Sequence, residues 1–262
     1  MEIFYKFMIL AFLFFCGCLI GWAIEVIFRR FQPENKERIW INPGFLVGPY
    51  LPLYGFGLVT LYLLAGLEKY IHTDSEITER LILFAVMAAA MTLIELVAGE
   101  IFIIRMHVKL WDYTDNRGNY KGIICPLFSF FWAVLGAVYY FLIHPHILNA
   151  LEWFSHNLLF SFFIGMFYGV FIIDLFYSFK VVEKIRAFAA ENEMVIRYEE
   201  LKKHIRTRSA ERREKYSFIL AFKTETALSE HLKEYFQKQR EEQKYDRLND
   251  FIKEKLKKAK ER

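Results

Sequence analysis

Long apolar runs constrain this chain of 262 residues more than any other feature of its sequence. The hydrocarbon core of a bilayer is about 30 Å thick, and an α-helix needs about 20 mostly apolar residues to cross it. Four runs meet this requirement, and none of them holds more than two charged residues: 4–28, 81–104, 123–143 and 158–179. The sequence therefore predicts an all-α, polytopic integral membrane protein.

A fifth apolar stretch, residues 44–67, is irregular because it contains Pro49, Pro52 and several glycines. Proline removes a backbone donor and glycine permits close backbone approach, so this stretch cannot form one regular helix. Residues 52–67 alone would span about 24 Å as a helix, which is short for a crossing. We therefore expect about five transmembrane helices, with unwound or re-entrant backbone before the second. The alternative is a tight packing turn that only lets helices approach each other.

Charge divides the chain into two unlike segments. Residues 1–179 hold 11 lysines and arginines against 14 acidic residues, whereas residues 180–262 hold 23 against 16. We therefore expect a transmembrane helical domain over residues 1–180 and a charged, cytoplasmic helical tail over residues 181–262.

The tail sequence is typical of amphipathic helix. It contains no glycine or proline, and apolar residues recur three or four positions apart in two groups. These residues are Leu228, Leu232 and Tyr235, then Tyr245, Leu248, Ile252 and Leu256. Ser209 is a candidate break with a new N-cap. The apolar cluster at residues 216–222 is too short to span a membrane, so we expect it to dock on a partner, on the chain itself or on the bilayer surface.

Basic residues in the short loops predict the orientation of the chain. The first and third loops carry four lysines and arginines each, whereas residues 68–80 carry two and the expected fourth loop, residues 144–157, carries none. The first and third loops and the tail are therefore expected in the cytoplasm, and the N-terminus outside. His144, His146 and His156 lie in the expected fourth loop and could bind a metal, although exposed loop histidines are the simpler interpretation.

Four carboxylates interrupt the apolar runs. They are Glu25, Glu95, Glu100 and Asp174. A charged side chain at the centre of a membrane helix costs about 2.5–3.5 kcal/mol on insertion scales, so each needs a partner or a function. Glu25 can pair with Arg29 one helical turn away, whereas the other three have no basic residue three or four positions away. Their partners must come from other helices, in a structural role or at a site that binds a ligand, an ion or a proton.

The third loop, residues 109–126, is dense in polar and aromatic residues. Asp112, Asp115 and Asn116 could bind a cation, but their spacing matches no calcium-binding loop, and Asp and Asn are also common turn formers. Pro126 is typical of the first turn of a helix.

Several of these segments form recognisable motifs. They are GW…E at residues 21–25, NPGFLVGPYLPLYGFG at 42–57, the Glu95 and Glu100 pair, WDYT at 111–114 and NYKGIIC at 119–125. Over residues 15–180 the chain resembles the CmpB-like ABC-transporter permease family, although relatives usually show NRGFL and WDYS where this chain has Pro43 and Thr114. The resemblance implies a multi-pass protein of the bacterial inner (cell) membrane, with the matched residues as its functional core.

We therefore expect a permease-like binding or transport unit whose polar site faces the cytoplasm. The candidate site residues are Glu25, Asn42, Gly44, Gly48, Pro49, Tyr54, Glu95, Glu100, Trp111, Asp112, Tyr113, Asn119 and Asp174. The alternatives are a membrane-embedded enzyme acting on a lipid-like substrate and a non-catalytic assembly or signalling protein that works through the tail.

Partners follow from the same features. The sequence identifies no catalytic residue, cofactor or metal site, and nucleic acid is not an expected partner because no binding module is recognisable. The lipid bilayer is the expected environment. The sequence contains no Walker-type phosphate loop, so an ATPase would be a separate subunit. Self-association through the tail is the other expected contact.

Overall fold

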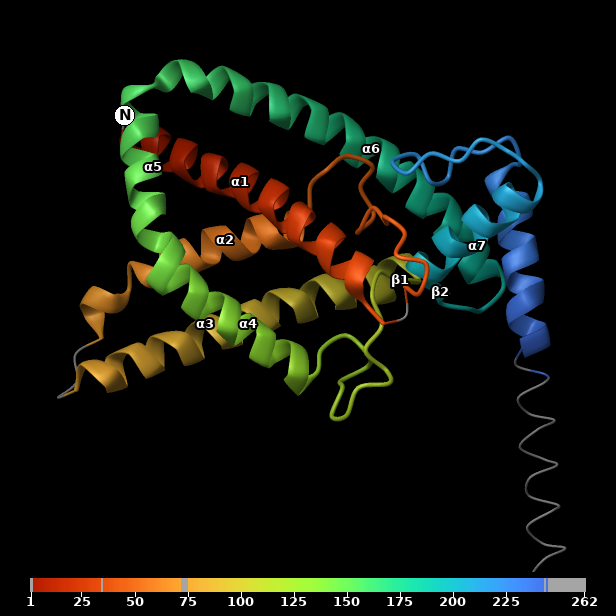
Figure 1. Cartoon of the computed structure of the whole chain (residues 1–262), viewed down its shortest axis with the longest axis horizontal. Helices are drawn as coiled ribbons and strands as arrows, with labels where there is room; N and C mark the ends of the chain where they lie inside the picture. Colours follow the sequence, from red (N-terminus) through yellow and green to blue (C-terminus); the bar gives the residue numbers. More distant parts are fainter. Residues whose placement is uncertain (1, 34, 72–74, 243, 245–262) are drawn as a thin grey trace, which may run out of the picture. The chain divides into compact units, whose positions relative to one another are not determined.

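The computed structural model describes residues 2–33, 35–71, 75–242 and 244 (Figure 1). The long helices are α1 (Glu2–Phe31), α2 (Pro52–Ala65), α3 (Glu76–Glu100), α4 (Pro126–Val138), α5 (His144–His156), α6 (Ser161–Glu191) and α7 (Tyr198–Glu211). Short 3₁₀ turns lie at Glu68–Tyr70 and Leu158–Phe160, π-helical turns at Ile101–Arg105 and Tyr139–Ile143, and two-residue strands β1 and β2 at Val108–Lys109 and Ile196–Arg197. A further helix covers residues 228–242. The all-α prediction is confirmed.

The chain forms two compact units, the first ending at Tyr198 and the second beginning at Glu199. The expected domain boundary after residue 180 falls within α6, which continues to Glu191.

Within the described part of the chain, four helical segments are long and apolar enough to cross a membrane. They are Ile3–Phe31, Glu76–Arg105, Pro126–His156 and Ser161–Glu191, and each contains or overlaps one of the four regular apolar runs. The helix α2 is not among them, because its 14 residues rise only about 21 Å. The chain is therefore a polytopic membrane protein, and a count of five crossings is not confirmed.

The prediction of a loop at residues 144–157 is wrong. These residues form α5, and Figure 1 shows α4 running into α5 through the π-helical turn. Pro145 lies in the first turn of α5, where its missing N–H is tolerated. Leu151 and Phe154 are buried, and the Phe154 ring stacks on Phe12 of α1 at 5.0 Å. Tertiary packing of this apolar face therefore stabilises the helix. The polar residues at both ends of the segment made it look like a loop in the sequence.

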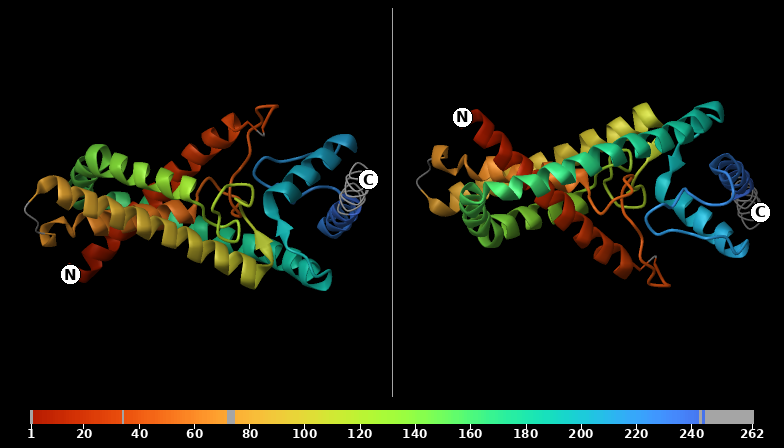
Figure 2. Two further views of the ribbon diagram at one scale, coloured as in Figure 1. Left: turned by 90° about the horizontal axis from the view of Figure 1, so that it is seen from below. Right: turned by 90° about the horizontal axis from the view of Figure 1, so that it is seen from above.

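The first unit is assembled by close helix packing around α1 and α2. In Figure 1, α2 lies between α1 and α3, and Figure 2 shows α1 crossing α6 obliquely. A Cβ atom added at Gly17 would lie 2.8 Å from the Tyr54 carbonyl oxygen, and one added at Gly21 would lie 2.2 Å from the Tyr54 side chain. Small residues four positions apart allow such approach between membrane helices. This packing places the Tyr54 side chain directly against α1.

Two short strands close one end of the first unit. The strand β1, which follows α3, pairs in parallel with β2, which follows α6, so that Val108 lies opposite Ile196. The helix α6 ends at Glu191 without glycine or proline, and Glu193 takes a left-handed φ of 51°. The backbone N–H of Met194 then donates to the carbonyl of Ala189 at 3.0 Å. A local turn closed by this backbone hydrogen bond thus ends a helix that its composition would let continue.

The second unit contains α7, an irregular segment at residues 212–227 and the helix at 228–242. The new N-cap predicted at Ser209 is wrong, because Ser209 is buried inside α7, on the same face as Leu201 and Ile205, although the helix does end two residues later, within the predicted stretch 206–213. Its small side chain fits a packed face, and α7 continues to Glu211. Leu232 and Tyr235 are buried on the second helix, as their spacing predicted.

The cluster at residues 216–222 lies in the irregular segment, where Ala221 is buried and Ile219 is exposed. Tyr245, Leu248, Ile252 and Leu256 lie outside the described residues.

Candidate functional site

Asp174 of α6 holds the irregular segment that precedes α2. Residues 38–51 form no helix or strand, which confirms the prediction of unwound backbone there. The Asp174 Oδ1 atom accepts hydrogen bonds from the Val47 backbone N–H at 3.1 Å and the Ser178 hydroxyl at 2.8 Å. Its Oδ2 atom accepts from the Gly48 N–H at 2.7 Å and the Tyr50 hydroxyl at 2.6 Å. We call these five residues the Asp174 clamp.

Asn42 fixes the beginning of the same segment. Its Oδ1 atom accepts a hydrogen bond from the Trp22 indole N–H at 2.7 Å, and its Nδ2 atom donates to the Val47 carbonyl at 2.9 Å. Gly44 takes a φ of +73°, a conformation that favours glycine. Pro49 is exposed at the turn beside the clamp. The segment is therefore tied both to α1 and to α6.

Glu95 lies in α3 and is 2% exposed. Its Oε1 atom accepts a hydrogen bond from the Tyr113 hydroxyl at 3.0 Å, and its Oε2 atom accepts from the Trp132 indole N–H at 2.9 Å. Within the described part of the chain, these neutral donors are its hydrogen-bond partners and no cation pairs with it. A buried carboxylate without a cation is costly to keep charged, which is the usual mark of a functional group in a membrane protein.

Tyr113 belongs to the third loop but reaches Glu95 in α3. Its ring stacks on Phe128 of α4 with centroids 4.0 Å apart. Burial, together with the negative charge of Glu95, raises the pKa of the Tyr113 hydroxyl well above its ordinary value. The hydroxyl therefore stays protonated and can only donate to the carboxylate at neutral pH.

Glu25 of α1 is linked to the same group of side chains. Its Oε1 atom accepts from Arg29 Nε at 2.8 Å, so the pair predicted from the spacing of four is present. Its Oε2 atom accepts from the Tyr54 hydroxyl at 2.9 Å, and the Tyr54 ring lies 5.6 Å from the Trp132 ring. We call Glu25, Tyr54, Glu95, Tyr113 and Trp132 the Glu95 network, which joins α1, α2, α3, α4 and the third loop.

The remaining loop residues make local contacts. Lys109 donates to Asp112 Oδ1 at 2.7 Å, and Arg197 of β2 lies 3.1 Å from Asp112 Oδ2. Partial burial alone would raise the pKa of Asp112, but hydrogen bonds from Lys109 and Thr114 lower it overall. The backbone N–H of Thr114 also donates to Asp112, so this residue acts as a turn former.

Trp111, Asn119 and Glu100 complete the candidate residues. The Trp111 indole donates to the Ile123 carbonyl at 2.8 Å, and Asn119 accepts from the Gly122 N–H at 2.9 Å. Glu100 pairs with Lys121 at 2.7 Å. The structure thus distributes the candidate residues among the Asp174 clamp, the Glu95 network and the turns of the third loop.

The family described as "Putative ABC-transporter type IV" matches residues 12–179. The chain belongs to this family. No curated protein and no solved structure matches it. The family match covers the Asp174 clamp and the Glu95 network and ends before the second unit.

The family assignment and the four apolar helices identify a membrane protein of a transport-related family. Sequence reasoning missed Trp132, whose indole N–H is a donor to Glu95, and placed Trp22 in a motif without naming its acceptor, which is Asn42. A buried tryptophan in an apolar helix needs a hydrogen-bond acceptor, so each of these two residues indicated a polar partner nearby. The sequence could not say which acceptor each one meets.

Proposed function

We propose that this chain is a permease-like transport unit in which Glu95 binds the transported cation or proton. The observation that carries this proposal is the position of Glu95, buried in a membrane-type helix and bound only by two neutral donors among the described residues. A structural carboxylate is usually neutralised by a cation or by backbone donors. Glu95 has neither, so a cation or a proton supplies the missing charge.

The Glu95 network connects Glu95 to side chains of three other helices. Tyr54 links the ion-paired Glu25 to the Trp132 ring, and Trp132 bonds Glu95. Tyr113 reaches Glu95 from a loop, so movement of the loop would change access to the carboxylate. In many transporters one helical bundle rocks or gates against another around a fixed binding site, and movement of this loop would be the local part of such a change.

The proposed orientation places the first and third loops and the second unit in the cytoplasm and the N-terminus outside. It requires α2 to return the chain across the inner membrane between α1 and α3, in addition to the four long helices. Basic residues concentrated in the first and third loops and in the tail support this orientation. The polar site would then open towards the cytoplasm. Since the chain has no phosphate-binding loop, ATP-driven transport would require a separate ATPase subunit.

Proton flux into vesicles tests the proposal. Full-length protein would be reconstituted into liposomes containing a pH-sensitive dye, and a potassium diffusion potential would drive proton entry. We expect flux with the wild-type protein and none with Glu95→Gln, which removes the titratable group but keeps the side-chain shape. Glu183→Gln is the matched control, because Glu183 is exposed on α6.

Equal flux through the wild-type and Glu95→Gln proteins would refute a proton-binding role for Glu95. The same assay with a cation-sensitive dye tests the cation alternative. Turnover of vesicle lipid without any flux would instead favour a membrane-embedded enzyme.

A further inference from the structure

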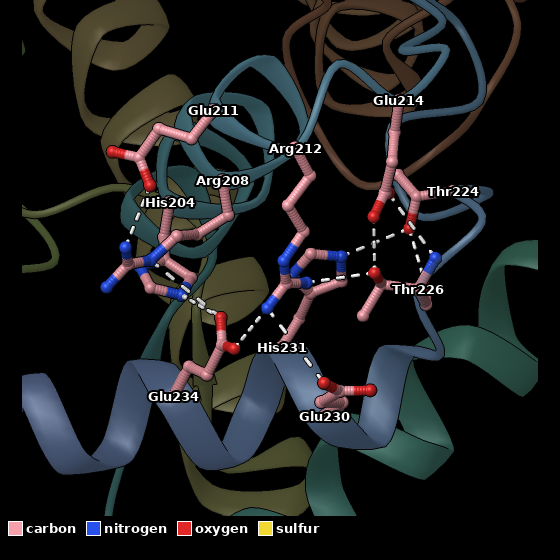
Figure 3. A network of polar contacts seen from close by, with 10 residues as sticks. All are labelled: His204, Arg208, Glu211, Arg212, Glu214, Thr224, Thr226, Glu230, His231 and Glu234. Atoms are coloured by element: carbon pink, nitrogen blue, oxygen red, sulfur yellow. Dashed lines mark hydrogen bonds and ion pairs between the residues drawn. The ribbon is translucent and has the colours of Figure 1, made fainter.

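Three metal-ligating side chains converge in the second unit. His204 comes from α7, while His231 and Glu234 come from the helix at residues 228–242 (Figure 3). One ligand atom from each residue lies within 4.8 Å of the others. His231 and Glu234 are three positions apart, so they share one helix face, and His204 faces them from α7.

Each of the three residues has a buried polar atom without a hydrogen-bond partner in the described part of the chain. These atoms are His204 Nε2, His231 Nδ1 and Glu234 Oε2. His204 is 8% exposed and His231 is 1% exposed. An unsatisfied buried polar group costs about 1–3 kcal/mol, so most native structures avoid even one. The convergence of three such atoms points to a group that satisfies all of them.

The opposite atoms of two ligands are already held in place. His231 Nε2 lies 3.1 Å from the Thr224 hydroxyl. Arg212 donates to Glu234 Oε1, whereas Oε2 accepts no hydrogen bond among the described residues and lies 3.9 Å from His204 Nε2. Outer hydrogen bonds of this kind orient imidazole and carboxylate ligands around metal ions. Figure 3 shows both contacts beside the three ligands.

Nearby arginines do not leave the site with excess positive charge. Arg208 pairs with Glu211 at 2.8 Å and lies 3.8 Å from Glu234 Oε2. Arg212 contacts Glu230 at 3.9 Å as well as Glu234. Each arginine therefore has a carboxylate partner other than Glu234, namely Glu211 for Arg208 and Glu230 for Arg212.

We propose that His204, His231 and Glu234 bind a divalent transition metal, with zinc as the fitting ion. Two imidazoles and one carboxylate are a recognised zinc ligand set, which leaves a fourth position for water or another ligand. Imidazole-rich sites favour zinc over magnesium or calcium, which prefer oxygen ligands. The bound ion would join α7 to the helix at residues 228–242. This inference concerns the second unit and does not depend on the proposed transport function.

Metal titration of the full-length, tag-free protein in detergent tests the site. After removal of metal with a chelator, we expect one zinc ion per chain by elemental analysis. Cobalt(II), used as a spectroscopic substitute, should give the visible absorption bands of a four-coordinate site. We expect His204→Gln and Glu234→Gln each to lower zinc affinity by more than about 100-fold, beyond the effect of losing an outer hydrogen bond.

Two matched controls distinguish this site from adventitious binding. His146→Gln removes an exposed histidine of α5, and Glu241→Gln removes an exposed carboxylate two turns after Glu234 on the same helix. Both variants should bind zinc as the wild type does. Equal loss of binding in His146→Gln, or unchanged binding in His204→Gln, would overturn the proposal.

Hydrogen exchange of the wild-type protein keeps the test independent of variant folding. Added zinc should slow amide exchange in α7 and in residues 228–242, because the ion binds only the folded arrangement. The exchange rates of α3 and α4 should not change. An absence of slowing at saturating zinc would also overturn the proposal.

Discussion

Asp174 and Glu95 are both buried carboxylates in membrane-type helices, yet their surroundings differ in one decisive respect. Asp174 accepts four hydrogen bonds, two of them from backbone N–H groups. Glu95 accepts one hydrogen bond at each oxygen, both from side chains. The Asp174 carboxylate thus meets four donors from its own and a distant segment, whereas each oxygen of Glu95 meets one neutral side-chain donor.

Two parts of one family motif, residues 42–57, have different surroundings in the same way. The segment from Asn42 to Gly48 is held at both ends, by Trp22 and by Asp174. Tyr54, only a few residues further along, donates to Glu25 instead. The motif at residues 42–57 is continuous in sequence, but its parts do different things. Its first part is backbone held in place by Trp22 and Asp174, and Tyr54 belongs to the Glu95 network.

Removal of the Asp174 carboxylate should have the largest effect on stability. Asp174→Ala leaves two backbone donors and two hydroxyls of the clamp without their acceptor, which should lower the free energy of unfolding by at least about 3 kcal/mol. Unfolding in mixed detergent and dodecyl sulfate micelles measures this change. Ser178→Ala is the matched comparison, because it removes one donor and should cost about 1 kcal/mol.

A loss below about 1 kcal/mol for Asp174→Ala would mean that the irregular segment does not depend on the clamp. In that case Asp174, like Glu95, would have to be treated as a functional carboxylate.

Glu95→Gln should affect stability less and transport more. Glutamine keeps one carbonyl acceptor, so the network loses about one hydrogen bond, at a cost of about 1–2 kcal/mol. The same micelle assay measures stability, and the vesicle assay measures flux. A loss of flux with a small loss of stability would sharpen the contrast with Asp174. A stability loss as large as that of Asp174→Ala would assign Glu95 a structural role.

Much of this arrangement was predictable because it depends on local sequence. Run length predicted the four membrane-type helices, proline and glycine predicted the unwound segment before Pro52, and a spacing of four predicted the Glu25–Arg29 pair. Each of these features follows from helix geometry and from backbone chemistry alone.

The partners of the buried carboxylates were not predictable in the same way. Trp132 lies 37 residues after Glu95, and Val47 lies 127 residues before Asp174. Such contacts depend on which helix faces meet, and that depends on packing over the whole unit. The helix α5 was missed for the same reason, since the packing of Phe154 on Phe12 decides it. Local patterns identify residues that need partners but not the partners themselves.

Tyr54→Phe should have an intermediate effect on the Glu95 network. Phenylalanine keeps the ring that packs against Gly21 and Trp132, so only the hydrogen bond to Glu25 is lost, at about 1 kcal/mol. A double-mutant cycle with Glu25→Gln measures the coupling in the free energy of unfolding. Coupling of about 0.5 kcal/mol or more indicates a direct interaction, whereas additive effects would remove Glu25 from the network.

Asp112 offers a third kind of carboxylate, which lies in the third loop and is paired with cations. Lys109 and Arg197 both contact it, so it links the third loop to β2, and its pKa is lowered in the folded protein. A lowered pKa means that the charged form stabilises the fold. This stability is fully present above the unfolded pKa of about 4 and is lost as the pH falls through the folded pKa.

Because Asp112 is partly exposed to solvent, its ion pairs should contribute only about 0.5–1 kcal/mol. Amide exchange at Ile196 and Arg197, compared at pH 7 and pH 3, measures this contribution locally. The wild-type strand pair should lose protection at the lower pH relative to Asp112→Asn, whose protection should change little. Asp115→Asn is the matched control, since Asp115 is exposed in the same loop. An identical pH response in the wild type and in Asp112→Asn would show that this carboxylate, unlike Asp174, does not hold its loop in place.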